Sequence, residues 1–313
     1  MKFEKIPAHE KGFKDSGKGL QGRMYNLKEF SVPVPNEELL LQAVSCRPAD
    51  GDTSYYYDQT MPKKKVVVHF TAGYLKSDIF YLTKKNNKVS VAFVIGRDGI
   101  IYNLFHSGKW SYHLGRGSVG GNGTNSKASI GIELSNIGPL KRIGDNLVTV
   151  YSDSDVYCTI EDKDQYVEIE NDFRGYTYFA AHTDAQYKSL AILLRYLTAK
   201  YDIPRAFLDE PLRYETNEQA AGFEGIVTHI NFRKSGKWDL GPGFDWKRLI
   251  ADVTGDGANL RPETLSRGMA APITEDQLED QVVVRTRGVS APEVDHGEEG
   301  PDVEERLVPM TEE

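Results

Sequence analysis

Two histidines at the ends of apolar segments are the residues of this sequence best suited to chemistry. His69 closes the run in KKVVVHFTAG, His229 closes the run in GIVTHINF, and Asp239 follows ten residues later in KWDLGPGFDW. Each apolar run predicts a buried strand, so three ligand-type side chains could meet at one edge of a sheet. Two imidazoles and a carboxylate are a ligand set of catalytic zinc. The alternative for each histidine alone is a core position satisfied by backbone hydrogen bonds.

The elements around these residues alternate between strand and helix patterns. A strand is expected over residues 66–70, then a helix that begins near Ser77 and is capped by its hydroxyl, then a β-hairpin around the turn at 97–99. ASIGIELSN predicts another buried strand. Thr183 and Gln186 fit a capping box that opens a long helix, which Pro204 prevents from continuing. GIVTHI and FDWKRLIADV predict the last strand and helix, so the fold class is α/β, with a central mixed β-sheet flanked by helices.

Three further regions adjoin this pattern. Residues 1–60 are expected to form an N-terminal extension packed on the main domain, with one short helix around 36–44. The main domain is expected over 61–254, with an inserted hairpin at about 140–178. Residues 255–313 predict an acidic, disordered tail, since 271–313 hold 13 acids against three arginines and show no apolar periodicity.

Composition excludes several classes of protein. The chain of 313 residues has 39% hydrophobic residues, which suffices for a core, and it contains no apolar stretch that predicts membrane insertion. The N-terminus lacks an apolar signal segment, so synthesis in the cytoplasm is expected. Cys46 and Cys158 are expected to be free thiols. The glycine-rich stretch LGRGSVGGNG lacks the GK[ST] ending of a phosphate-binding loop, and neither nucleotide nor nucleic acid is expected as a partner.

Glu133 is a charged residue within a strand that should be buried. Such a position requires a partner or a function. A carboxylate could accept a proton from water and then donate one to a leaving nitrogen, as amide hydrolysis requires. A buried structural ion pair is the alternative.

Five blocks in order carry a family resemblance: HFTAG, RDG, IGIELSN, THINF and KWDLGPGFDW. Together they resemble the zinc-dependent N-acetylmuramoyl-L-alanine amidases of the type 2 class, which include peptidoglycan recognition proteins and phage lysozyme-like amidases. The resemblance covers about residues 65–253, and KWDLGPGFDW is its most specific block. It implies hydrolysis of the amide between N-acetylmuramic acid and the L-alanine of the stem peptide, with peptidoglycan or muropeptides as the substrate.

The resemblance also implies roles for individual residues. His69, His229 and Asp239 match the Zn²⁺ ligands, and Glu133 matches the catalytic acid. Lys237 matches the lysine that stabilises the oxyanion, although a solvated surface lysine is the alternative.

Two positions near the expected site need separate comment. The segment KWSYHLGRG, with Trp110 and His113, is similar to the loop that lines the family's substrate groove; a surface histidine without a task is the alternative for His113. Where some relatives have a tyrosine in the strand before RDG, this chain has Val91. Either Glu133 carries the proton transfer here or the enzyme is impaired.

Two other functions remain open at this point: a non-catalytic peptidoglycan-binding module, and a structural or assembly protein derived from an amidase. An active enzyme could recycle wall fragments, act as a phage endolysin, or be delivered to a rival's wall. Its site of action would then be the cell wall or periplasm after release or delivery, and a protein partner for the acidic tail is conceivable.

Overall fold

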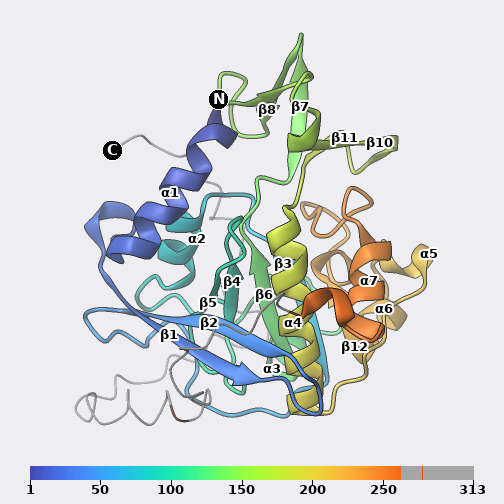
Figure 1. Cartoon of the computed structure of the whole chain (residues 1–313). Coiled ribbons are helices and arrows are strands. Elements are labelled where there is room, and N and C mark those ends of the chain that lie inside the picture. Colours follow the sequence, from blue (N-terminus) through green and yellow to red (C-terminus); the bar gives the residue numbers. More distant parts are fainter. Residues whose placement is uncertain (262–276, 278–313) are drawn as a thin grey trace.

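A seven-stranded mixed sheet forms the centre of the structure, a computed structural model that describes residues 1–261 and Gln277 (Figure 1). The strand order is β1-β2-β5-β4-β6-β3-β12. Strands β4, β6, β3 and β12 run parallel to one another, whereas β1 with β2 and β4 with β5 pair antiparallel. The predicted α/β class with a mixed sheet is therefore confirmed. The strand bounds are β1 Tyr25–Pro33, β2 Leu40–Pro48, β3 Lys65–Phe70, β4 Phe93–Ile95, β5 Ile101–Asn103, β6 Ser129–Leu134 and β12 Gly225–Thr228.

The register of three parallel strands aligns the residues expected to do chemistry. Val68 of β3 pairs with Thr228 of β12, so His69 and His229 come next to each other at the strand ends. On the other side, His69 pairs directly with Glu133 of β6. Neighbouring strands lie about 4.8 Å apart, and paired residues point to the same face of a sheet. His69 and Glu133 therefore lie in one row across β3 and β6, and His229 lies beside this row, directly after the end of β12.

Helices cover the sheet, and α4 is the longest of those in residues 1–261. It contacts β2, β3 and β4 and packs beside α7 (Figure 1). Thr183 caps α4 as predicted, because its hydroxyl accepts the Gln186 backbone N–H at 3.1 Å. None of these helices combines the length and the apolar character that a membrane span requires. The helix bounds are α1 Lys2–Ser16, α2 Leu75–Leu82, α3 Asn122–Ala128, α4 Asp184–Tyr201, α5 Glu210–Arg213, α6 Glu218–Gly222 and α7 Trp246–Thr254, with short 3-10 turns at Leu20–Gly22, Lys163–Gln165, His229–Asn231 and Ala258–Leu260.

The start of α2 differs from the prediction. Its cap position is Tyr74, and Ser77 lies inside the first turn. The Ser77 hydroxyl donates to the Tyr74 carbonyl at 2.7 Å, so it does not cap the N-terminal N–H groups. The helix therefore starts earlier than its serine suggested.

The N-terminal 60 residues contribute directly to the central sheet. The predicted helix around 36–44 is wrong, because Leu40–Pro48 form β2, which pairs with β1 and with β5. The NEELLLQAV sequence suits a helix locally, but β2 has a neighbouring strand on each side and α4 against one face. Tertiary packing overrides local propensity here. The division of the chain at residue 61 stays a prediction, but the sheet runs across it.

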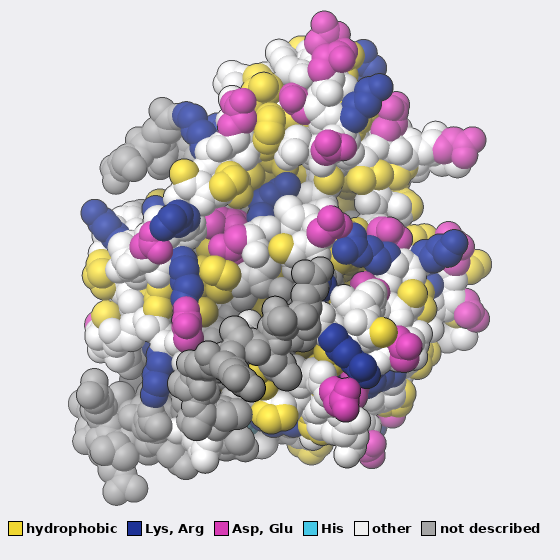
Figure 2. Space-filling view, viewed as in Figure 1, with side chains coloured by type: hydrophobic (Ala, Val, Ile, Leu, Met, Phe, Trp, Pro, Cys, Tyr) yellow, Lys and Arg dark blue, Asp and Glu magenta, His cyan; other side chains and the backbone are white. Residues whose placement is uncertain are grey.

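The inserted segment is larger than the predicted hairpin. It forms a second sheet of five strands in the order β10-β11-β7-β8-β9. This sheet forms a lobe at the top of Figures 1 and 2, and acidic and basic side chains are interspersed on its surface in Figure 2. A lone hairpin is only marginally stable in water. The extra strands enclose a small core that also takes in Ile6 of α1, with Leu140, Leu147 and Tyr157 among its members. The strand bounds are β7 Pro139–Ile143, β8 Asn146–Thr149, β9 Val156–Thr159, β10 Tyr166–Phe173 and β11 Tyr176–Ala180.

The first residues of the predicted tail pack on the domain. Leu260 is 3% exposed and belongs to the main core, and Asn259 donates a hydrogen bond to Asp252 of α7. Residues 262–276 and 278–313, including most of the acidic segment predicted to be disordered, lie outside the described residues. Cys46 and Cys158 are both buried free thiols, as predicted.

Replacing Leu260 with alanine tests whether residues beyond 254 belong to the domain. Because the leucine is buried, Leu260→Ala should lower the free energy of unfolding by about 2–5 kcal/mol. Urea denaturation measures the change. Ile143→Ala is the control, because Ile143 is 44% exposed and its truncation should cost much less. Equal stability of Leu260→Ala and wild type would show that the segment does not contribute to the core.

Candidate metal centre

His69, His229 and Asp239 converge on one point at the carboxyl edge of the parallel strands. The Nδ1 atoms of the two histidines are 2.9 Å apart. Oδ2 of Asp239 lies 3.2 Å from Nδ1 of His229 and 3.3 Å from Nδ1 of His69. All three side chains are buried. The structure thus brings together the three residues that the sequence predicted as metal ligands.

The backbone positions these ligands in two ways. His69 lies in β3 and His229 directly follows β12, whose last residue Thr228 pairs with Val68, so the sheet register brings the two histidines together. Asp239 comes from a loop between the 3-10 turn His229–Asn231 and α7. Its backbone carbonyl accepts the N–H of Ile230 at 3.1 Å, which ties the loop to the residue after His229.

Backbone carbonyls fix the protonation of both imidazoles. Nε2 of His229 lies 2.9 Å from the carbonyl of Leu114, which can only accept, so Nε2 carries the proton. The protonation of His69 is fixed in the same way, but through the side chains of His113 and Ser129. Ser129 donates to the Asn125 carbonyl at 2.6 Å and therefore accepts from Nε2 of His113 at 2.9 Å.

Nδ1 of His113 is then an acceptor, and Nε2–H of His69 donates to it at 3.0 Å. Both histidines that face Asp239 consequently present an unprotonated Nδ1 to the centre. A second partner that fixes the tautomer is typical of metal-binding histidines.

The donor set fits a zinc ion. Two bare nitrogens 2.9 Å apart, beside a carboxylate, repel one another unless a cation lies between them. Zn–N and Zn–O bonds of about 2.0–2.1 Å at tetrahedral angles place ligand atoms about 3.3 Å apart. The observed edges of 2.9, 3.2 and 3.3 Å are close to that spacing.

The electrostatics favour the metal-binding protonation states. Burial lowers the pKa of His229, and the nearby Lys237 charge lowers it further, against the opposing effect of Asp239. Burial alone would raise the pKa of Asp239, and positive charge at His229 and His69 would lower it. With both imidazoles neutral, a cation bound between the three side chains would have this lowering effect instead. The set therefore offers two neutral imidazoles and one carboxylate at neutral pH.

Glu133 and Lys237 lie beside the centre. Glu133 is buried on β6 opposite His69, on the same face of the sheet. Lys237 is half-buried two residues before Asp239, near enough to His229 to shift its pKa. Neither residue belongs to the three-residue ligand group.

Trp110 and His113 occupy different surroundings from those the sequence suggested. Trp110 is buried and stacks on Tyr57, with ring centroids 4.1 Å apart. His113 is 4% exposed and bonds to His69, so it supports a ligand from behind. This supporting role was missed, because nothing in the sequence reveals that SYHLG packs against the strand end of His69.

A glycine makes room for this arrangement. A Cβ on Gly131 of β6 would lie 2.7 Å from Cγ1 of Val91 and 3.2 Å from Cγ of His113. A side chain at this position would therefore clash with Val91 and crowd His113, which explains the glycine within the IGIEL block.

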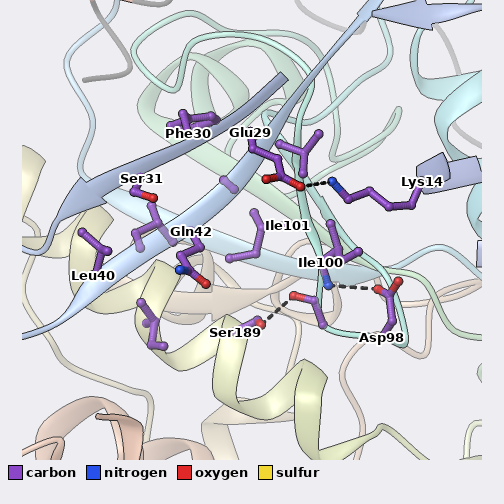
Figure 3. A pocket seen from close by; sticks show the side chains of 15 residues that line it. Lys14, Glu29, Phe30, Ser31, Leu40, Gln42, Asp98, Ile100, Ile101 and Ser189 are labelled. Atoms are coloured by element: carbon purple, nitrogen blue, oxygen red, sulfur yellow. Dashed lines mark hydrogen bonds and ion pairs between the residues drawn. The ribbon is translucent and has the colours of Figure 1, made fainter. Parts of the chain in front are cut away.

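A cavity of about 380 Å³ lies elsewhere in the molecule (Figure 3). It opens between β1, β2, the turn before β5 and α4, with an ion pair between Lys14 and Glu29 at one side and Phe30 and Ile101 in its wall. None of the predicted site residues lines it. Its position separates it from the chemistry of the metal centre.

Comparison with models of known protein families shows the family to which this chain belongs. The family model described as N-acetylmuramoyl-L-alanine amidase matches residues 59–243, more than half of the chain. The chain belongs to this family. The match includes every residue of the metal centre and the whole inserted sheet.

Solved amidase structures resemble the chain more distantly. The amidase AmiD from E. coli, in complex with the substrate anhydro-N-acetylmuramic acid-L-Ala-D-gamma-Glu-L-Lys, is 20% identical, with a TM-score of 0.39, over 72% of each chain. PlyL is 18% identical, with a TM-score of 0.37, over 64% of this chain and 88% of its own. The amidase LysC from Clostridium intestinale is 15% identical, with a TM-score of 0.35, over 64% and 92%. No curated protein sequence matches the chain.

Removing the carboxylate ligand should weaken metal binding. Asp239→Ala leaves two protein ligands, so the purified variant should hold much less than the one zinc per chain expected of wild type. Elemental analysis after dialysis measures this. The control Asp164→Ala removes an exposed aspartate and should retain zinc. Unchanged zinc in Asp239→Ala would refute the ligand assignment.

Removing the partner of His69 should weaken metal binding less. His113→Phe keeps a ring but deletes the acceptor of the His69 Nε2–H, and loss of such an outer partner typically costs about 10–100-fold in metal affinity. Competition with a chelator measures the zinc dissociation constant. His106→Phe, away from the cluster, is the control. Equal affinities for both variants would remove His113 from the support of the site.

Proposed function

We propose that this protein is a zinc-dependent peptidoglycan hydrolase that cleaves the amide between N-acetylmuramic acid and the L-alanine of the stem peptide. The convergence of two unprotonated histidine nitrogens and a carboxylate, in a chain of the amidase family, is the observation that carries the proposal. His69, His229 and Asp239 would hold the ion. When bound, zinc supplies Lewis acidity to the reaction.

Glu133 would move the proton in the proposed reaction. Its carboxylate lies on the same face of the sheet as His69, one strand away. There it can accept a proton from the attacking water and deliver it to the amide nitrogen as the C–N bond breaks. With Val91 buried where some relatives have a tyrosine, Glu133 is the residue to which we assign this task.

Lys237 would stabilise the charge that develops on the carbonyl oxygen. It is half-buried next to the ligand loop, and its positive charge reaches the centre, since it lowers the pKa of His229. A fixed cation in a poorly solvated site stabilises an oxyanion more than it would in water.

Two alternatives remain to be tested against this proposal: a peptidoglycan-binding module without activity, and a structural protein derived from an amidase. The complete ligand set together with Glu133 and Lys237 favours an enzyme. The proposed activity would serve wall recycling, phage lysis or delivery to another cell's wall, and the acidic tail could bind a protein partner.

Product analysis tests the reaction and the form of the substrate together. Wild type loaded with zinc should release peptides that begin with a free L-alanine amino group, and mass spectrometry would identify them. Soluble muropeptides and intact sacculi serve as parallel substrates, and Asp239→Ala is the inactive control. Wall binding without cleavage would support the binding module, and neither binding nor cleavage would support the structural protein.

Replacing the two non-ligand residues separates catalysis from metal binding. Glu133→Gln and Lys237→Ala should each keep zinc, while kcat on muropeptides falls by about 100-fold or more. Glu224→Gln, which changes an exposed glutamate, should keep wild-type kcat. A near wild-type rate in either site variant would exclude that residue from the mechanism.

A further inference from the structure

The turn between β10 and β11 of the inserted sheet reaches the loop that carries Asp239. Arg174 lies at this turn, and its side chain is half-buried. Its Nη1 donates to the carbonyl of Arg233 at 3.0 Å and also to the carbonyl of Lys237. Its Nη2 lies 3.3 Å from Oγ1 of Thr216. One guanidinium therefore joins two points of the loop on the N-terminal side of Asp239.

Other contacts of the same turn hold the residues on either side of Asp239. The indole N–H of Trp238 donates to the Arg174 carbonyl at 3.1 Å, and the ring of Tyr176 meets the Trp238 ring edge-on at 5.6 Å. A Cβ on Gly241 would lie 2.8 Å from the Phe173 ring, so that ring lies directly against the loop backbone. The turn thus contacts the loop at positions 238 and 241.

The backbone conformation of the turn is one that disfavours arginine, which suggests that the Arg174 side chain is present for its contacts. Arg174 has φ of 52° and Gly175 has φ of 93°. Two successive residues with positive φ are typical of hairpin turns that favour Asn-Gly. An arginine in the first position is strained relative to asparagine or glycine, yet it supplies donors that neither of those residues could extend to Arg233 and Lys237.

We propose that Arg174 is a positioning residue through which the inserted sheet holds the Asp239 loop in its metal-binding geometry. The two histidines need less such help, because His69 lies in β3 and His229 directly follows β12, which pairs with β3 up to the preceding residue. Asp239 comes from a loop and does need it. The planar guanidinium suits this task, since it donates in several fixed directions at once, whereas a lysine ammonium does not have that geometry.

The inference rests on the proposed zinc site. The experiment that tests it therefore makes one measurement on metal-free protein and one on zinc binding. The variants are Arg174→Ala and Arg174→Lys. Arg142→Ala is the matched control: Arg142 also lies in the inserted sheet, where it bonds to Gly144 and Tyr178 and not to the loop. The metal-free proteins are compared by hydrogen–deuterium exchange over residues 233–241, and chelator competition gives the zinc dissociation constants.

Arg174→Ala should exchange faster over 233–241 and bind zinc about 10-fold more weakly, which is the scale for loss of an outer contact. Arg174→Lys should fall between Arg174→Ala and wild type, and Arg142→Ala should match wild type in both measurements. Unchanged exchange and affinity in Arg174→Ala would overturn the inference. Equal effects of Arg142→Ala would also overturn it, because they would assign the result to the inserted sheet as a whole.

The same measurements distinguish failure of this inference from failure of the proposed function. Wild type that binds no zinc would refute the metal site, while exchange over 233–241 would still decide whether Arg174 holds the loop. Should Arg174→Ala fail to fold, Arg174→Lys carries the comparison: wild-type exchange and zinc affinity in that variant would show that the guanidinium geometry is not required.

Discussion

The architecture of the site depends on where two backbone carbonyls lie. The carbonyl of Leu114 binds Nε2–H of His229, and the carbonyl of Asn125 sets the direction of the chain through Ser129 and His113 to His69. Because a carbonyl cannot donate, each chain of hydrogen bonds has only one direction. Both imidazoles are therefore left with a bare Nδ1 at the centre. Burial then makes an unfilled centre costly and a bound cation favourable.

The surrounding residues follow from this constraint. Gly131 has no side chain because Val91 and His113, which packs behind His69, fill the space beside it. The 110–114 segment lies buried rather than along an open groove, since His113 contacts His69 and Leu114 contacts His229. Glu133 and His69 are paired on neighbouring parallel strands, and His229 directly follows the next strand, so a carboxylate lies beside the two proposed histidine ligands without a long loop. The rigid part of the site is thus built by sheet register.

Asp239, the third proposed ligand, is positioned in a different way. Asp239 comes from a loop rich in glycine and proline, and such a loop has no register to position it. Contacts from outside the loop take that place: the Ile230 N–H to the Asp239 carbonyl, and the turn around Arg174 from the inserted sheet. The inserted sheet therefore borders the centre through Arg174, which precedes Asp239 by 65 residues in the sequence.

The sequence by itself determined the local features. Apolar runs predicted β3, β6 and β12, the Thr183 capping box predicted α4, and the spacing of histidines and aspartate predicted the ligand group that the structure brings together. These succeed because they depend on short-range periodicity and on side-chain chemistry. Only the tertiary structure decided the rest. Residues 40–48 form a strand because β1 and β5 flank them, the insertion closes into a sheet because it needs a core, and His113 and Arg174 act through partners 44 and 63 residues away. No local pattern encodes such contacts, since packing between distant segments sets them.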